Sequence, residues 1–421
     1  MPLPQPENYF DRLMFIAMKA CSCHETSGIR YFMFAIVIWT LYELSFAINI
    51  INAENVYDVM DVIVYVICSA GGIVTVILLY HRKLMNATLN RGRENLFRYT
   101  EDEQMQRDYE QTIDRTGIKS VFSVVSILLY ASVFFFVIPP QIIAIYSADK
   151  TRSSFEKSVA FPTWFPFKLN TWRRFLIANA MQSSAAAVVS FNLQCGFLLF
   201  FYETIIVRYE TEALFEIMNR TNTRLDNERK ANYDRIIRES NNGRGVRNND
   251  NSNNINKQLL LLQQKDEASF ITFLKQCYQH HVAICKFVTD TVECYMVAIV
   301  ILMGAMYMDL VLDTYLIIKE PHFSRKLERV VNFAITMTVL FVLCYIGERL
   351  IEINGRYRDQ IYQTTWYDRP IAVKKLVLRL LCVNNWTQSI SFTPNKTLSL
   401  MLFGAIIKSV YSTIQFLIAV T

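Results

Sequence analysis

Charged residues are scarce in this 421-residue sequence, and apolar residues are abundant. Only 19% of the residues are Asp, Glu, Lys or Arg, 52% are hydrophobic, and the mean hydropathy is +0.20. Water-soluble domains carry about 25% charged residues, so this shortage excludes an ordinary chain of two or three soluble domains. Glycine is also sparse, with 12 residues, and none of them forms a glycine-rich phosphate cradle. The composition predicts apolar surface that faces lipid.

The nine cysteines form neither a zinc pattern nor a disulfide framework. His280 and His281 stand close in sequence to Cys277 and Cys285. Adjacent residues point in different directions on a helix, however, and no carboxylate stands at ligand spacing. We therefore expect no metal and no other cofactor. No nucleophile elbow or related catalytic motif occurs, so we predict that the protein is not an enzyme.

Seven stretches are long and apolar enough to cross a bilayer, whose hydrocarbon core of about 30 Å requires roughly 20 residues of helix. The fourth and fifth stretches continue into polar sequence with helical character, so they should extend past the membrane. We predict an all-α integral membrane protein with seven transmembrane helices and cytoplasmic helical extensions that form a bundle. The seven spans are Tyr31–Ile51, Val56–Tyr80, Val121–Tyr146, Phe175–Val207, Cys294–Ile318, Val330–Ile351 and Leu398–Val420.

The distribution of Lys and Arg predicts the orientation. Twenty-nine lie in the N-terminal segment and the connections after spans two, four and six, against ten in the connections after spans one, three and five. Cytoplasmic loops carry the excess of positive charge, so the N-terminus is expected in the cytoplasm and the C-terminus outside. Three of the four glycosylation sequons, at Asn86, Asn219 and Asn385, fall on the predicted inner side, where no glycan is added, and the fourth, at Asn395, lies at the foot of the last span.

Two cytoplasmic segments have distinctive sequences. Ser240–Asn256 is rich in Asn and nearly free of apolar groups, which predicts a disordered insert; a regulatory or partner-binding loop is the alternative. Pro370 suits the first turn of a helix, and apolar residues at helical spacing follow it as far as Leu381, with basic residues between them. This amphipathic helix either lies on the membrane surface or forms a subunit interface.

The last span carries a polar stripe. Lys408, Ser412, Gln415 and Ala419 are separated by steps of four, three and four residues, which places them on one face of a helix. Such a face is costly against lipid and favourable against a water-filled axis between subunits. The alternative is a packing face of small residues against another helix.

Several short motifs, in their order and position, resemble those of the insect odorant receptor family. The resemblance extends over the whole layout: seven spans, a cytoplasmic N-terminus, a long cytoplasmic link after span four, and a terminal helix with almost no tail. The Gln415-Phe416 pair is similar to the signature of the related gustatory receptors. However, Lys408-Ser409 stand where that signature has Thr-Tyr, which favours the odorant branch. The motifs that carry the resemblance are Tyr362-Gln-Thr-Thr-Trp366-Tyr, Lys374-Lys375-Leu376, Leu398-Ser-Leu400 and Lys408-Ser-Val-Tyr411-Ser.

The resemblance implies an odorant receptor that is a subunit of an odorant-gated, non-selective cation channel. Such subunits form a heterotetramer with a co-receptor in the plasma membrane of sensory neurons. They bind a small volatile organic ligand and no nucleic acid. Ser412 stands where the co-receptor has an apolar residue, which indicates a ligand-tuned subunit. A gustatory receptor channel and a metabotropic seven-helix receptor are the alternatives.

The resemblance also implies the functional positions. The last helix lines the pore, and the ligand pocket lies in the outer half of spans two to six; Met and aromatic walls suit an apolar volatile, although ordinary helix packing is the alternative for each residue. The pore residues are Lys408, Ser412, Gln415 and Phe416, and the subunit anchor contains Tyr362, Trp366 and Leu376. The expected pocket residues are Tyr57, Val64, Tyr130, Phe134, Phe135, Met181, Ser184, Met303, Met306 and Tyr307.

This interpretation divides the chain into five parts. They are residues 1–207, with spans one to four; 208–293, the cytoplasmic extensions with the disordered insert at 240–256; 294–351, with spans five and six; 352–397, the cytoplasmic anchor segment; and 398–421, the pore-lining last span.

Overall fold

The structure is a computed structural model. It describes residues 28–53, 56–68, 71–93, 96–112, 142, 145, 161, 163–242, 249–319, 323–383, 391–393 and 396–420. The expected third span, Val121–Tyr146, therefore lies outside the described residues except at two positions.

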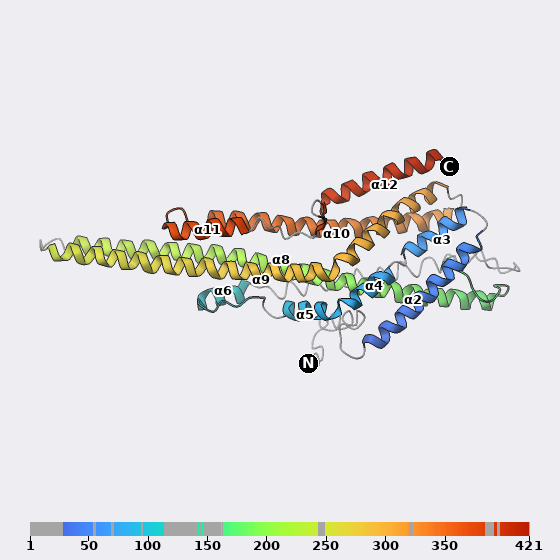
Figure 1. Ribbon diagram of the computed structural model, residues 1–421, viewed down its shortest axis with the longest axis horizontal. Helices are drawn as coiled ribbons and strands as arrows, with labels where there is room; N and C mark the ends of the chain where they lie inside the picture. Colours follow the sequence, from blue (N-terminus) through green and yellow to red (C-terminus); the bar gives the residue numbers. More distant parts are fainter. Residues whose placement is uncertain are drawn as a thin grey trace.

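Two very long antiparallel helices form the spine of the molecule (Figure 1). Helix α8 is Trp172–Asn242 and helix α9 is Asn249–Lys319, and each has 71 residues. At about 1.5 Å per residue, each is about 105 Å long, more than three times the thickness of a bilayer core. Only part of each helix is apolar, so the remainder must project into water, as the sequence predicts.

Shorter helices pack along this spine. Helix α10 runs beside α9 and carries the chain back along the α8–α9 hairpin, where α11 folds against it (Figure 1). The helices are α2 (Gly28–Ile51), α3 (Val56–Cys68), α4 (Gly71–Tyr80), α5 (Arg82–Arg93), α6 (Glu103–Thr112), α10 (Phe323–Gln363), α11 (Ile371–Val383) and α12 (Leu400–Val420).

Six of the seven expected spans coincide with apolar helices in the part of the chain that the structure describes. Five single helices are long and apolar enough to cross a membrane, and a sixth span is obtained when the bent pair Val62–Leu78 and Arg82–Gly92 is counted as one. The bend between the two parts of that pair is 80°. The single helices are Met33–Ile51, Trp172–Arg238, Lys257–Lys319, Arg329–Gln363 and Leu400–Ala419.

The Asn-rich insert is shorter than the sequence predicts. Helix α8 continues to Asn242 and helix α9 begins at Asn249, so the expected disorder at 240–256 is wrong for the helical residues; 243–248 lie outside the described part. Asn and Asp are favoured where a helix begins, and Asn249-Asp250-Asn251 supply such a start. Composition alone underestimated how far the helical hairpin extends.

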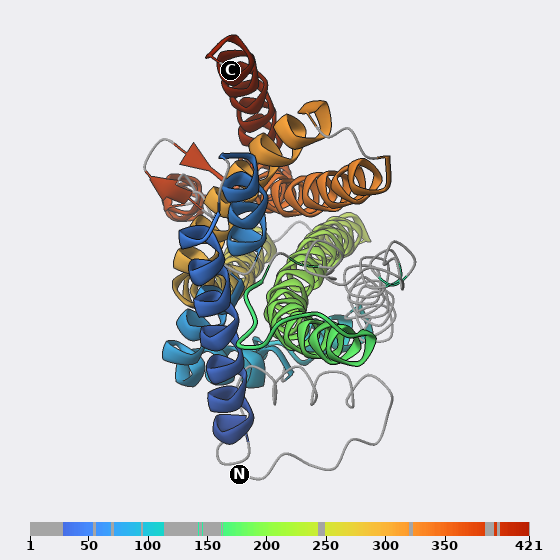
Figure 2. The same ribbon diagram turned by 90° about the vertical axis from the view of Figure 1, so that its right-hand side faces the viewer.

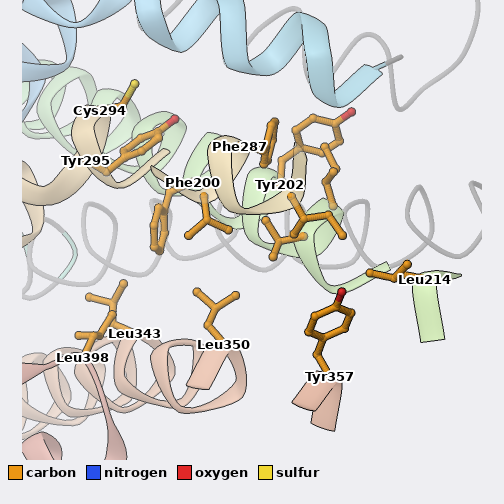
Figure 3. Close-up of a cluster of buried hydrophobic side chains, with 14 of the residues drawn as sticks. Phe200, Tyr202, Leu214, Phe287, Cys294, Tyr295, Leu343, Leu350, Tyr357 and Leu398 are labelled. Carbon is orange, nitrogen blue, oxygen red and sulfur yellow. The ribbon is translucent and has the colours of Figure 1, made fainter. Parts of the chain in front are cut away.

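One large apolar core joins the helices (Figure 3). Phe200 and Tyr202 of α8 lie in it with Phe287 and Tyr295 of α9, and Tyr357 of α10 belongs to the same cluster. These side chains are almost fully buried, so van der Waals packing between the helices holds them together. The core fixes α9 as the central helix, in contact with α3, α4, α5, α8, α10, α11 and α12.

The chain approaches its last helix through a short antiparallel pair, β1 (Ser391–Thr393) and β2 (Lys396–Thr397). This pair is a small exception to the predicted all-helical content. The amphipathic helix expected after Pro370 is confirmed, because α11 begins at Ile371. Viewed along the spine, α12 stands at the margin of the bundle (Figure 2).

Candidate functional site

The start of α12 is held by a set of contacts with α10. The Leu402 amide donates to the Ser399 hydroxyl at 3.3 Å, so Ser399 caps the helix. The Leu400 amide donates to the Glu348 carboxylate at 3.1 Å, which places negative charge at the positive end of the helix. Gly347 of α10 faces Leu398 so closely that a Cβ at position 347 would lie 2.1 Å from the Leu398 carbonyl oxygen.

Beyond its fixed start, α12 has one packed face and one open face. Val410 and Ile414 are buried against the core, and Ile406, Ile407 and Leu417 pack beside them. Ile407 and Ile414 therefore belong to the inner face of the subunit. The choice of Lys408, Ser412 and Gln415 as the pore stripe predicts that these two residues face lipid. That prediction is wrong.

All four expected pore residues lie together on the open face. Lys408, Ser412, Gln415 and Phe416 are exposed in the single chain, and the Phe416 side chain is 66% exposed. An exposed Lys, Ser and Gln on a helix of bilayer length need a polar neighbour that the subunit itself does not supply.

The expected pocket residues are only partly brought together. Met303 and Met306 of α9 are buried in the main core. Val64 is buried in a separate cluster with Tyr315 and Leu316, outside the contacts of the two methionines. Leu417 of α12 packs against both clusters, so the two sets of residues meet at the last helix.

Three further expected pocket residues, Met181, Ser184 and Tyr307, lie within the described part of the chain, and Tyr307 packs against the same cluster as the two methionines. Met181 is 53% exposed on α8, and the Ser184 hydroxyl donates to the Met181 carbonyl at 2.8 Å. The Tyr307 hydroxyl lies 2.8 Å from Thr413 Oγ1 of α12. The side chain of Tyr57 and the residues Tyr130, Phe134 and Phe135 lie outside the part that the structure describes.

A polar network joins α9 and α10. The sequence did not predict that its residues contact one another. The Asn332 amide donates to Asp309 at 3.3 Å and to Asp313 at 2.5 Å, and the Thr336 hydroxyl donates to Asp309 at 2.7 Å. Arg329 donates to Asp313 at 3.5 Å and lies 4.7 Å from the centre of the Tyr65 ring of α3. The sequence signal for this network is the spacing of its polar residues, which lie three or four positions apart on each of the two helices.

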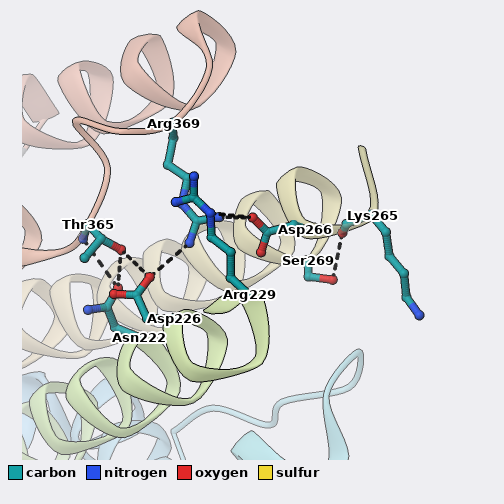
Figure 4. A network of polar contacts seen from close by, with 8 residues as sticks. All are labelled: Asn222, Asp226, Arg229, Lys265, Asp266, Ser269, Thr365 and Arg369. Atoms are coloured by element: carbon teal, nitrogen blue, oxygen red, sulfur yellow. Dashed lines mark hydrogen bonds and ion pairs between the residues drawn. The ribbon is translucent and has the colours of Figure 1, made fainter. Parts of the chain in front are cut away.

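The segment after α10 is held to α8 and α9 by a buried arginine, Arg369 (Figure 4). Arg369 pairs with Asp226 of α8 at 3.3 Å and with Asp266 of α9. The Thr365 hydroxyl donates to Asp226 at 3.0 Å. One guanidinium can serve both carboxylates because its donors form a rigid fork, so this joint fixes where α11 begins.

The three expected anchor residues differ in their surroundings. Trp366 and Leu376 pack against the core of their own chain, whereas Tyr362 is 65% exposed. Tyr362 borders a groove of about 400 Å³ with Leu378 and Cys382. Of the three, Tyr362 is therefore the residue that borders this open groove between α10 and α11.

The His and Cys residues considered above as metal ligands instead make contacts among the packed helices. His280 lies between the Tyr99 hydroxyl, at 2.8 Å from Nδ1, and the Glu210 carboxylate, at 3.2 Å from Nε2. His281 stacks on Tyr357 with ring centres 3.9 Å apart. Burial raises the pKa of the Cys277 thiol, so that thiol stays protonated. The described residues contain no group of His, Cys, Asp and Glu side chains able to hold a metal ion.

Two kinds of comparison identify the architecture. The family model "7tm Odorant receptor" matches residues 55–411. The solved structure of the insect olfactory receptor OR5 from Machilis hrabei is similar over 100% of this chain and 94% of its own, with a TM-score of 0.70 and 12% identity. The structure of the same receptor in complex with eugenol is similar over 98% of both chains, with a TM-score of 0.71 and 12% identity. No curated protein matches.

These findings confirm the predicted all-α membrane architecture with seven transmembrane helices. They also bear out the resemblance seen in the short sequence motifs, since the matched region covers most of the chain. The chain belongs to the 7tm odorant receptor family.

Proposed function

We propose that this odorant receptor is a ligand-tuned subunit of an odorant-gated, non-selective cation channel, and that it assembles with co-receptor subunits into a heterotetramer. The observation that carries the proposal is the open polar face of α12. Only 11% of the apolar window of α12 is buried in the chain, against 56% for α9. An exposed Lys, Ser and Gln on a helix of bilayer length are costly against lipid, which supports assembly with further subunits around a polar axis.

Four α12 helices around an axis supply a polar conduit and an apolar constriction. Phe416 is the constriction, because a narrow hydrophobic ring blocks ions by excluding water. Gln415 offers an amide oxygen to a partly hydrated cation beside that ring. Four Lys408 ammonium groups in a narrow ring would repel cations, so a heteromer, in which only some subunits carry this Lys, is the consistent assembly.

The ligand of this channel is a small, mostly apolar volatile that binds in the outer half of the subunit. Met303 and Met306 form part of the wall, and methionine adapts to irregular apolar shapes. A receptor of similar fold binds eugenol, which supports a small organic ligand. Binding that is tighter in the open state shifts the population toward conduction.

The proposed orientation places the N-terminus in the cytoplasm and the C-terminus outside, in the plasma membrane of sensory neurons. The excess of Lys and Arg on the side of the α8–α9 hairpin supports this orientation. The hairpin and the segment 352–397 form the cytoplasmic anchor between subunits.

The test is electrical. The chain is expressed with and without a co-receptor, and currents are recorded across a panel of volatiles. We expect ligand-evoked cation currents only in the co-expressing cells, with an onset that is independent of G-protein inhibitors. A response that needs G-protein signalling, together with a cytoplasmic C-terminal epitope, would instead establish a metabotropic receptor.

A further inference from the structure

Tyr307 of α9 connects the outer half of α12 to the rest of the subunit through hydroxyl groups. Its oxygen lies 2.8 Å from Thr413 Oγ1 and 3.3 Å from Ser409 Oγ. Thr413 Oγ1 in turn lies 2.9 Å from the Ser409 carbonyl oxygen. One choice of protons satisfies all three distances: Ser409 donates to Tyr307, Tyr307 donates to Thr413, and Thr413 donates to the carbonyl of Ser409.

The position of these residues on α12 is informative. Ser409 and Thr413 are one turn apart, on the flank between the packed residues Val410 and Ile414 and the exposed pore stripe. Thr413 precedes the Phe416 constriction by three residues, or roughly 4.5 Å of helix rise. The hydroxyl relay therefore lies directly beside the part of α12 that must move for the constriction to widen.

The two ends of α12 are held in different ways. Its start is fixed by the close approach of Leu398 to Gly347 and by the bond from Leu400 to Glu348. Farther along, its attachments to the rest of the subunit include apolar contacts and the Tyr307 relay. Helix α9, which carries Tyr307, is packed by α3, α4, α8 and α10, so α12 is the helix with freedom to tilt.

We propose that the Tyr307–Thr413–Ser409 relay is a latch that holds α12 in the shut position, a role that rests on the proposed channel function. When α12 tilts about its fixed start, the flank that carries Ser409 and Thr413 leaves Tyr307 and both interhelical bonds break. The latch adds its free energy to the shut state only, and it thereby sets how much ligand is needed for opening. Tyr307 is a positioning residue for the gate and does not line the conduit.

The test removes the hydroxyl groups one at a time. Tyr307→Phe keeps the ring and abolishes both interhelical bonds, and Thr413→Val keeps the shape and removes one partner. Each should raise the ligand-free current and lower the half-maximal ligand concentration by about threefold to tenfold, the range expected for a net hydrogen bond. The double variant should equal Tyr307→Phe, because both changes remove the same bond.

Thr338→Val on α10 is the matched control, since it removes a hydroxyl whose only described bond, to the Ala334 carbonyl, stays within its own helix. It should leave both quantities unchanged. Unchanged ligand-free current in Tyr307→Phe would overturn the latch. A lower current would also overturn it, because the bonds would then transmit opening. Fully additive effects of Tyr307→Phe and Thr413→Val would show that they act separately, which contradicts a single relay.

A second measurement needs no current. Ser412→Cys is reacted in membranes with a charged thiol reagent, alone and combined with Tyr307→Phe, and modification of the peptide that contains residue 412 is followed by mass spectrometry. The latch predicts severalfold faster modification when Tyr307 is replaced, and equal rates would overturn it. Absence of ligand-evoked current in the wild-type complex would refute the channel function itself, while the modification rates would still decide whether Tyr307 restrains α12.

Discussion

The guanidinium of Arg369 lies over the Phe270 ring, 4.4 Å from its centre, and the same group pairs with one carboxylate from each helix of the α8–α9 hairpin. Arg369 lies in the connection after span six. Its three partners are all more than 90 residues away in sequence. It converts two helices that project far beyond the bilayer into a platform for α11.

Replacement of Arg369 should therefore destabilise the joint between α8, α9 and the start of α11. Arg369→Ala leaves Asp226 and Asp266 without their shared cation and should cost about 3 kcal/mol. Arg369→Lys should recover only part of this loss, because an ammonium cannot span both carboxylates. Thermal unfolding in detergent, followed by size-exclusion chromatography, measures the effect. Arg379→Ala, at an exposed site on α11, is the control; equal melting of all variants would contradict the role of Arg369.

Of the glycines of α10, Gly347 should be the one whose replacement by a larger residue destabilises the protein most. A methyl group there would meet the backbone of Leu398, so Gly347→Ala should force α12 away from α10 at a cost of about 1–3 kcal/mol or more. Gly355→Ala is the matched control on the same helix, with open space around the added group. It should be neutral or stabilising by up to about 1 kcal/mol, since Ala favours helix over Gly. Equal yields of folded receptor from both variants would argue against a fixed start of α12.

The groove between α10 and α11 should control assembly without affecting the subunit fold. Leu378→Asp, at a side chain that is 53% exposed, should reduce recovery of the tetramer while the monomer remains folded. Trp366→Ala removes a core contact and should lower the yield of folded subunit instead. Native mass or size measurement separates the two effects. An intact tetramer with Leu378→Asp would place the anchor elsewhere.

Hydropathy predicted six spans that coincide with apolar helices among the described residues, because lipid imposes an apolar stretch on each helix separately. Pro370 likewise predicted where α11 begins. What the sequence could not provide is the rotation of each helix about its axis. Ile407 and Ile414 look lipid-facing beside a polar stripe, yet they pack against the core of the subunit, and the Tyr307 hydroxyl reaches Thr413 of α12. Both outcomes depend on contacts across about 100 residues, which periodicity does not encode.

The two buried methionines of α9 should influence ligand potency. Met303→Leu and Met306→Leu conserve volume, so the fold should tolerate them, but they change the shape of the proposed pocket wall. A shift in half-maximal concentration of about threefold or more is expected, with normal surface expression. Met308→Leu lies on an exposed face of the same helix and serves as the control. Identical potency in all three variants would remove these methionines from the pocket.

Cysteine accessibility on α12 tests the central claim, that the open face of this helix lines the ion path. Ser412→Cys and Gln415→Cys are compared with Val410→Cys and Ile414→Cys in the complex with the co-receptor, with a charged thiol reagent applied together with ligand. We predict that the reagent blocks current through the first pair and leaves the second pair unaffected, because Val410 and Ile414 pack inside the subunit. Block at Val410 and Ile414, with none at Ser412 and Gln415, would contradict the account.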